Sequence, residues 1–161
     1  MPFYVGPQKW WLALKSIVTD GLVLNLDAGN PSSYPGSGTT WTDLSGNNYN
    51  GTLENGVSYD SANQGSLVFD GNNDYVTLGT PALLSGYQLP LTITGWAYLT
   101  TYDNLSTLYG NYTGVGGGAL YNLFRVDGNT LKLYASTASN YYQYQGTFIP
   151  TLNTWNFYAV V

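Results

Sequence analysis

The stretch WTDLSGNNYNGTLENGVSYDSANQGSLVFDGNNDYVTLG, residues 41–79, decides the fold class. It consists of short apolar runs separated by turn-forming residues such as Asn55-Gly56. Asn, Asp and Gly tolerate positive φ or close Asx turns, so these positions reverse the chain. The runs at residues 67–69 and 75–78 are too short for helices and are spaced as in hairpins. The stretch therefore predicts an antiparallel β-meander in which these two runs meet across neighbouring strands on one buried face.

The same pattern continues on both sides of this stretch. Residues 22–26 alternate Leu with other side chains and predict a half-buried strand, and residues 91–98 predict another with Trp96 and Tyr98 on one face. Asp127-Gly128-Asn129 predicts a hairpin turn. The run 155–161 predicts a strand whose apolar face is Trp155, Phe157, Ala159 and Val161.

The composition supports an all-β domain and excludes several classes of partner. Aromatic residues make up 16% of the 161-residue chain, and Gly and Asn punctuate it frequently. The net charge is −5 with four cations, which excludes nucleic acid because backbone binding requires several Lys or Arg. No apolar run approaches the ~20 residues of a membrane-spanning helix, so membrane insertion is not expected.

Two motifs carry a family resemblance. They are W-x-D-L-S-G-N-x-x-x-G-T-L-x-N-G at residues 41–56 and G-S-L-x-F-D-G-x-N-D-Y-V at residues 65–76. Together with residues 17–41, they resemble laminin-G-like, concanavalin A-like lectin/glucanase domains of the kind found in phage virion proteins and bacterial surface proteins. The resemblance implies an antiparallel two-sheet jelly-roll sandwich over residues 21–161. It also implies that this sandwich is incomplete at the C-terminus, because the family adds a hairpin and a closing strand after such a Trp strand.

Residues 1–20 differ in composition from the rest of the chain and are expected to form an N-terminal arm. The adjacent Trp10 and Trp11 are typical anchors of protein interfaces, and residues 8–18 have the spacing of a short helix. One interpretation is that the arm packs on its own domain. The other is that it docks onto other virion or surface proteins, as part of a homo-oligomer or larger assembly.

The sequence offers little for catalysis. A glycoside hydrolase needs two carboxylates that flank the scissile bond, but Glu54 is the only Glu and lies beside a turn. The chain has no His and no Cys, which removes the usual bases, nucleophilic thiols and zinc ligands. We therefore expect no enzymatic activity.

Calcium is the one cofactor that the sequence suggests. Asp70, Asn72 and Asp74 crowd a single turn, and Ca²⁺ prefers oxygen ligands from flexible loops. The alternative is that these residues only make the turn, since turns need Asp and Asn without any metal.

Glycan binding is the most specific functional hypothesis. Sugars stack on aromatic rings, while amides and hydroxyls pair with sugar hydroxyls. On the strand at residues 141–148, one face is expected to be core and the other a polar aromatic strip; Tyr as a plain strand former is the alternative. The candidate residues are Trp96, Tyr98, Tyr109, Asn111, Tyr112, Tyr142, Gln143, Tyr144 and Gln145.

These observations lead to one functional hypothesis with two alternatives. The hypothesis is a non-enzymatic, lectin-like structural protein of a virion or an extracellular surface, such as a phage tail fibre or capsid decoration, that adheres to polysaccharide. The first alternative is an assembly subunit without a glycan ligand, since Tyr and Trp also anchor protein interfaces. The second alternative is a polysaccharide hydrolase.

Overall fold

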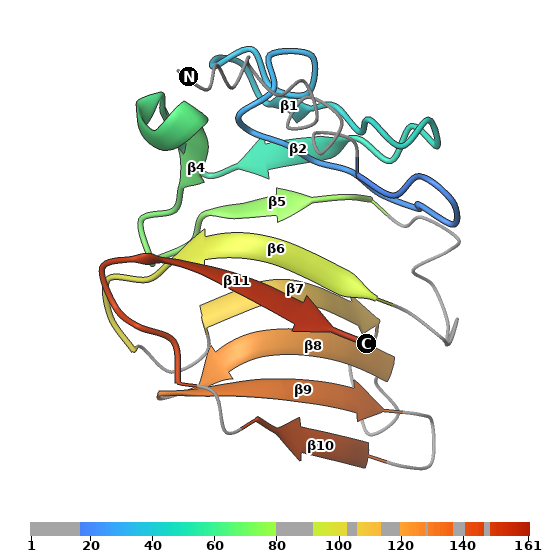
Figure 1. Cartoon of the computed structure of the whole chain (residues 1–161), viewed down its shortest axis with the longest axis vertical. Helices are drawn as coiled ribbons and strands as arrows, with labels where there is room; N and C mark the ends of the chain where they lie inside the picture. The colour runs from blue at the N-terminus through green and yellow to red at the C-terminus, as the bar shows by residue number, and fades with distance from the viewer. Residues whose placement is uncertain are drawn as a thin grey trace, which may run out of the picture. The chain divides into compact units, whose positions relative to one another are not determined.

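The computed structural model describes residues 17–79, 92–102, 106–113, 120–127, 129–136, 141–146 and 149–161. These residues form an all-β structure in which every paired strand is antiparallel (Figure 1). The chain divides into two compact units, residues 1–79 and 80–161. The all-β antiparallel class predicted from the sequence is confirmed.

The first unit holds two small sheets within its described residues, 17–79. Their strands are β1 (Thr40–Trp41), β2 (Gly51–Glu54) and β5 (Tyr75–Thr77) in the order β1-β2-β5, and β3 (Ser58–Asp60) paired with β4 (Ser66–Val68). A single turn of 3-10 helix, Ala62–Gln64, is the helical segment in the described part of this unit.

The pairing of these strands differs from the predicted meander. β5 pairs with the distant β2 rather than with β4, and Phe69 lies outside any strand with an exposed side chain. Gly51 makes the approach of β5 feasible, because a Cβ at this position would lie 2.7 Å from Val76 Cγ1. Leu53, opposite Val76, is buried. Burial of this long-range pair therefore outweighs the local hairpin that the turn residues suggested.

A buried carboxylate organises the first unit. Asp43 is 6% exposed, and its Oδ1 accepts the N–H groups of Asn25 and Ser45, both at 2.9 Å. Its Oδ2 accepts the Ser45 hydroxyl at 2.7 Å and the Tyr49 N–H at 3.0 Å. Burial acts to raise the pKa of Asp43, but these four hydrogen bonds outweigh it and hold the pKa below its ordinary value of 3.8. Among the described residues, the charged carboxylate is thus stabilised by oriented dipoles.

The same network explains why the predicted strand at residues 22–26 is absent. These residues are half-buried along their whole length and join no sheet. The Asn47 side-chain amide donates to the Val23 carbonyl at 2.9 Å, and the Leu44 N–H donates to the Asn25 carbonyl at 2.8 Å. The backbone groups that a strand would place in a ladder are therefore bound by the loop at residues 43–47 instead.

The described part of the second unit holds six strands in two sheets. A two-stranded ribbon pairs β6 (Ile93–Tyr98) with β11 (Trp155–Val160), and a four-stranded sheet has the order β10 (Tyr141–Gln145), β9 (Thr130–Ser136), β8 (Leu120–Asp127), β7 (Ser106–Thr113). The hairpin predicted at residues 127–129 is confirmed, since Asp127 pairs with Thr130.

The apolar face predicted for β11 is its exposed face. Asn156 and Tyr158 point inward, and Tyr158 is only 2% exposed. Because side chains alternate along a strand, Trp155, Phe157 and Ala159 point outward and are exposed. The predicted strand and the shared apolar face of Trp155, Phe157 and Ala159 are confirmed, with Val161 directly after the strand; this face is exposed.

The Asp43 network gives a testable prediction. We expect Asp43→Asn to lower the free energy of unfolding by about 2–3 kcal/mol, because the new NH₂ group faces donors where the carboxylate accepted. Asp60→Asn is the matched control: this exposed carboxylate accepts one N–H, from Ala62, and its replacement should cost less than about 1 kcal/mol. Urea unfolding followed by circular dichroism measures both values.

The same carboxylate predicts a pH dependence. Because the folded-state pKa is depressed, the stabilisation by Asp43 is complete above the unfolded value near 3.8 and is lost as the pH falls through the folded-state pKa. Below about pH 4, wild type should lose stability more steeply than Asp43→Asn. Equal acid profiles for the two proteins would contradict the assignment.

Candidate functional site: an aromatic face on the β6–β11 ribbon

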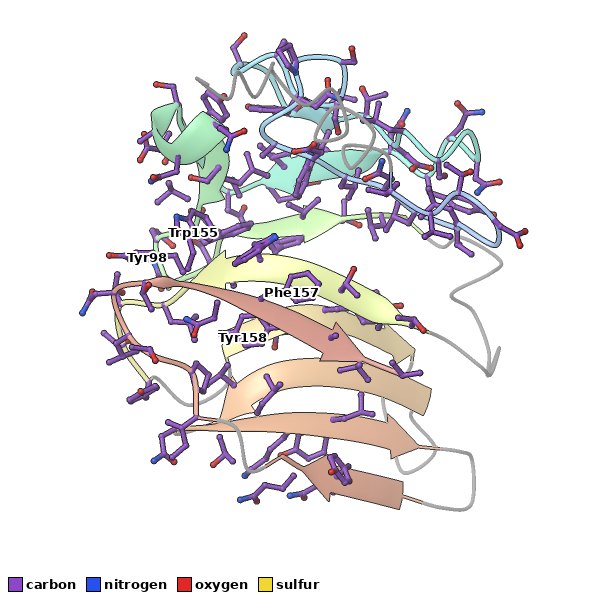
Figure 2. The ribbon with its side chains drawn as sticks, viewed as in Figure 1. Tyr98, Trp155, Phe157 and Tyr158 are labelled. Atoms are coloured by element: carbon purple, nitrogen blue, oxygen red, sulfur yellow. The ribbon has the colours of Figure 1, made fainter. Side chains whose placement is uncertain are left out.

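Four aromatic rings lie together on the outward side of the β6–β11 ribbon. The register places Phe157 opposite Trp96 and Trp155 opposite Tyr98. The rings of Trp96 and Phe157 are 5.2 Å apart and tilted by 55°, and those of Tyr98 and Trp155 are 5.8 Å apart at 65°. Both geometries are favourable for aromatic pairs. Figure 2 shows Tyr98 and Trp155 at the start of β11, with Phe157 further along the strand. We call these four residues the aromatic face.

The aromatic face is open to solvent. The exposed fractions of its residues are 66% for Trp96, 52% for Phe157, 45% for Tyr98 and 37% for Trp155. Aromatic side chains of this size are normally buried, and an exposed cluster of them marks a site of interaction. The remaining cross-strand pair on this side is Thr94 with Ala159, so the ribbon contributes no charged side chain to the face.

A buried amide holds the ribbon at the end where Trp155 begins β11. The Asn156 Nδ2 donates to the carbonyls of Thr151 and Thr154, at 2.8 and 3.0 Å, and its Oδ1 accepts the Thr151 N–H at 3.1 Å. The Asn153 N–H donates to the Leu99 carbonyl at 2.8 Å, which ties this turn to the end of β6. The turn is therefore fixed from both strands, and rings held this way lose little entropy when a ligand binds.

The structure places two of the residues predicted to bind glycan beside two others. Trp96 and Tyr98 share one face of β6, as predicted, and this face is exposed. Trp155 and Phe157 were predicted to share the apolar face of a strand but were not among the candidate glycan residues. Asn156 could have indicated the exposure of these two rings. An Asn side chain that hydrogen-bonds the backbone of a turn from the inner side of a strand places the two neighbouring side chains on the outer side.

The other predicted glycan residues lie on the four-stranded sheet. Tyr109 in β7 is half-buried, and burial raises the pKa of its phenol above 10.0. Asn111 and Tyr112 in β7 pair with Asn122 and Tyr121 of β8, and the structure describes the backbone but not the side chains of these four residues.

The exposure of β10 differs from the expectation that one of its faces is core. Gln143, Tyr144 and Gln145 are all exposed, although successive side chains of a strand point to opposite faces. Over these residues neither face of β10 is core, contrary to the prediction that one of them would be. Tyr142, whose backbone pairs with Ala135, has a side chain outside the described residues.

The turn suggested for calcium is closed by its own side chains. Asp70 Oδ1 accepts the Asn72 N–H at 2.8 Å, and Asp74 Oδ2 accepts the Asp70 N–H at 3.0 Å. These bonds account for the turn without a metal. Within the described part of the chain, no three Asp, Glu, His or Cys side chains gather as a metal site. Calcium binding by Asp70, Asn72 and Asp74 stays a prediction.

Comparisons with family models, with curated proteins and with solved structures found no match to this chain. Trp10 and Trp11, the predicted anchors of the N-terminal arm, lie outside the described residues. Among the residues that are described, no helix is long and apolar enough to cross a membrane.

The support of the aromatic face can be tested at Asn156. We expect Asn156→Asp to lower the free energy of unfolding by about 2–3 kcal/mol, because a carboxylate would face the Thr151 and Thr154 carbonyls that now accept from Nδ2. Asn153→Asp introduces the same charge at an exposed position of the same turn and should cost less than about 0.5 kcal/mol. Urea unfolding measures both variants, and equal costs would contradict the role of Asn156.

Proposed function

We propose that the protein is a non-enzymatic carbohydrate-binding module that uses the aromatic face to adhere to polysaccharide. The observation that carries the proposal is the solvent exposure of four paired rings on one ribbon. Aromatic rings attract the C–H groups on the apolar face of a sugar, because the ring face is electron-rich. The proposal includes a jelly-roll arrangement of the sheets. It is supported by the antiparallel all-β structure and by the resemblance of residues 41–56 and 65–76 to laminin-G-like domains.

The area of the face favours a small or thin ligand over a protein partner. The four exposed fractions together amount to about two whole aromatic side chains, or about 400 Å². A stable protein interface buries about 800 Å² on each partner, so these rings alone supply only half of it. A polysaccharide chain needs less area, because each sugar contributes its own stacking contact.

The charge distribution favours a neutral glycan. Seven of the nine acidic residues and two of the four basic residues lie in residues 1–79, which leaves residues 80–161 formally neutral. The ribbon strands have no charged residue with which to bind a carboxylated or sulfated polymer. We therefore propose that the ligand is a neutral polysaccharide of a host or of the environment, and that the protein itself is displayed on a virion or an extracellular surface, as the family resemblance implies.

A polysaccharide pull-down tests the proposal. Wild type should bind at least one insoluble neutral polysaccharide, such as a glucan, xylan, mannan or chitin. Trp96→Ala and Phe157→Ala should each weaken binding about 10-fold or more, since each removes a stacking surface worth over 1 kcal/mol. Tyr144→Ala is the matched control: it removes a ring that is 71% exposed but belongs to β10, and should leave binding unchanged.

Three outcomes would contradict the proposal. Wild type could fail to bind any polysaccharide, which would favour the assembly-subunit alternative. Binding could persist in Trp96→Ala and disappear in Tyr144→Ala, which would move the site to β10. Incubation with the bound polysaccharide could also release soluble sugar, which would support the hydrolase alternative.

A further inference from the structure

β10 is the outermost strand of its sheet, and its outer edge has no neighbour among the described strands (Figure 1). Its inner edge is paired with β9 along the whole strand. All five residues, Tyr141–Gln145, pair in continuous register with β9, and the Gly146 N–H extends the ladder by donating to the Leu131 carbonyl at 2.9 Å. The backbone groups that alternate with these therefore point away from the sheet and are available to another strand.

β10 lacks the devices that normally protect an edge strand. Such strands usually carry a charged residue, a Pro or a β-bulge, any of which prevents pairing with another chain. β7, the opposite edge of the same sheet, has a register shift between Thr107 and Tyr109 and contains Gly110. The sequence of β10, YYQYQ, has no charge, Pro or Gly, and its register is regular. Of the two edges of this sheet, β10 is the one open to pairing.

The exposure of the β10 side chains indicates that this strand gains little stabilisation from side-chain packing in its own sheet. Gln143, Tyr144 and Gln145 are exposed in succession, so neither face of the strand is buried there. β6 and β11 also have open outer edges among the described strands, but β11 is anchored by the buried Tyr158 and β6 contains Gly95. Gly in a strand interior weakens pairing. A second neighbour would therefore stabilise β10 more than β6 or β11.

We propose that β10 pairs antiparallel with β10 of a second copy of this chain, across a two-fold axis at Gln143. This register is the one in which all five residues of both strands overlap. It places Gln143 opposite Gln143 of the second copy, and Tyr142 opposite Tyr144 of the second copy. No like charges face each other along the strands. The result is a continuous eight-stranded sheet made from two four-stranded sheets.

The distribution of charge favours a second copy as the occupant. β10 lies in residues 80–161, which are formally neutral, whereas the net charge of −5 comes from residues 1–79. Two copies that meet at β10 therefore join at the part of the chain with the least net repulsion. An isologous contact also closes on itself, so it produces a dimer and not an open fibre.

Disulfide trapping in the full chain tests the register directly, because the protein has no Cys. In the proposed dimer the two Cα atoms of residue 143 lie about 4.5–5.5 Å apart, within the range of a disulfide. Gln143→Cys should therefore form a covalent dimer when oxidised with diamide. In Gln145→Cys the two sulfur-bearing residues are offset by four positions, about 13 Å, so this matched control should remain monomeric.

Sedimentation velocity supplies the second measurement. Wild type should be a dimer that dissociates on dilution, and Gln143→Lys should shift it to monomer by placing two like charges opposite each other. Circular dichroism should show that Gln143→Lys remains folded, since the side chain is exposed. A monomeric wild type, or equal cross-linking of the Gln143→Cys and Gln145→Cys variants, would overturn the proposal. Neither result bears on polysaccharide binding at the β6–β11 ribbon.

Discussion

The first unit depends on one constraint: a buried, charged carboxylate must be surrounded by hydrogen-bond donors. Asp43 meets this requirement with three backbone N–H groups and one hydroxyl, which come from three separate places in the sequence. Each donor is fixed in position because the carboxylate would be costly to bury if any were missing. This accounts for the spacing of the D-L-S-G-N motif. Ser45 supplies both a backbone and a side-chain donor, and Asn47 binds the backbone of residues 22–23 from the other side.

A comparable constraint sets the outward surface of the second unit. The Asn156 amide makes three hydrogen bonds to the turn at residues 151–154, and can do so only from the inner side of β11. Strand geometry then places Trp155 and Phe157 outside, where the register with β6 brings them opposite Tyr98 and Trp96. The exposed aromatic face is thus a consequence of a buried polar group. Asp43 in the first unit and Asn156 in the second thus hold the turns around them through their side-chain hydrogen bonds, and Asn156 also determines which side chains of β11 are exposed.

The sequence was sufficient for features that depend on local chemistry. Turn residues and short apolar runs predicted the all-β class, the hairpin at residues 127–129 and the shared face of Trp96 and Tyr98. It was insufficient where a distant group decided the outcome. The strand at residues 22–26 is replaced by side-chain hydrogen bonds from residues 43–47, and β5 pairs with β2 because Gly51 allows close approach. Apolar alternation correctly grouped Trp155, Phe157 and Ala159 on one face of β11, but it did not indicate that this face is exposed, because that depends on the hydrogen bonds that Asn156 makes.

The two units differ in how their surfaces can interact. Residues 1–79 carry all of the net charge, and the strands described in them are only two to four residues long. Residues 80–161 are formally neutral and present exposed aromatic rings on one ribbon and a regular, uncharged edge at β10. Net charge keeps a protein soluble, whereas neutral apolar surfaces and open strands favour association. The charged half of the chain is therefore distinct from the half that carries both proposed contacts. Because the aromatic face and the β10 edge lie on different strands, the proposed polysaccharide binding and the proposed pairing of two copies need not compete, and such a dimer would offer two aromatic faces to one polymer.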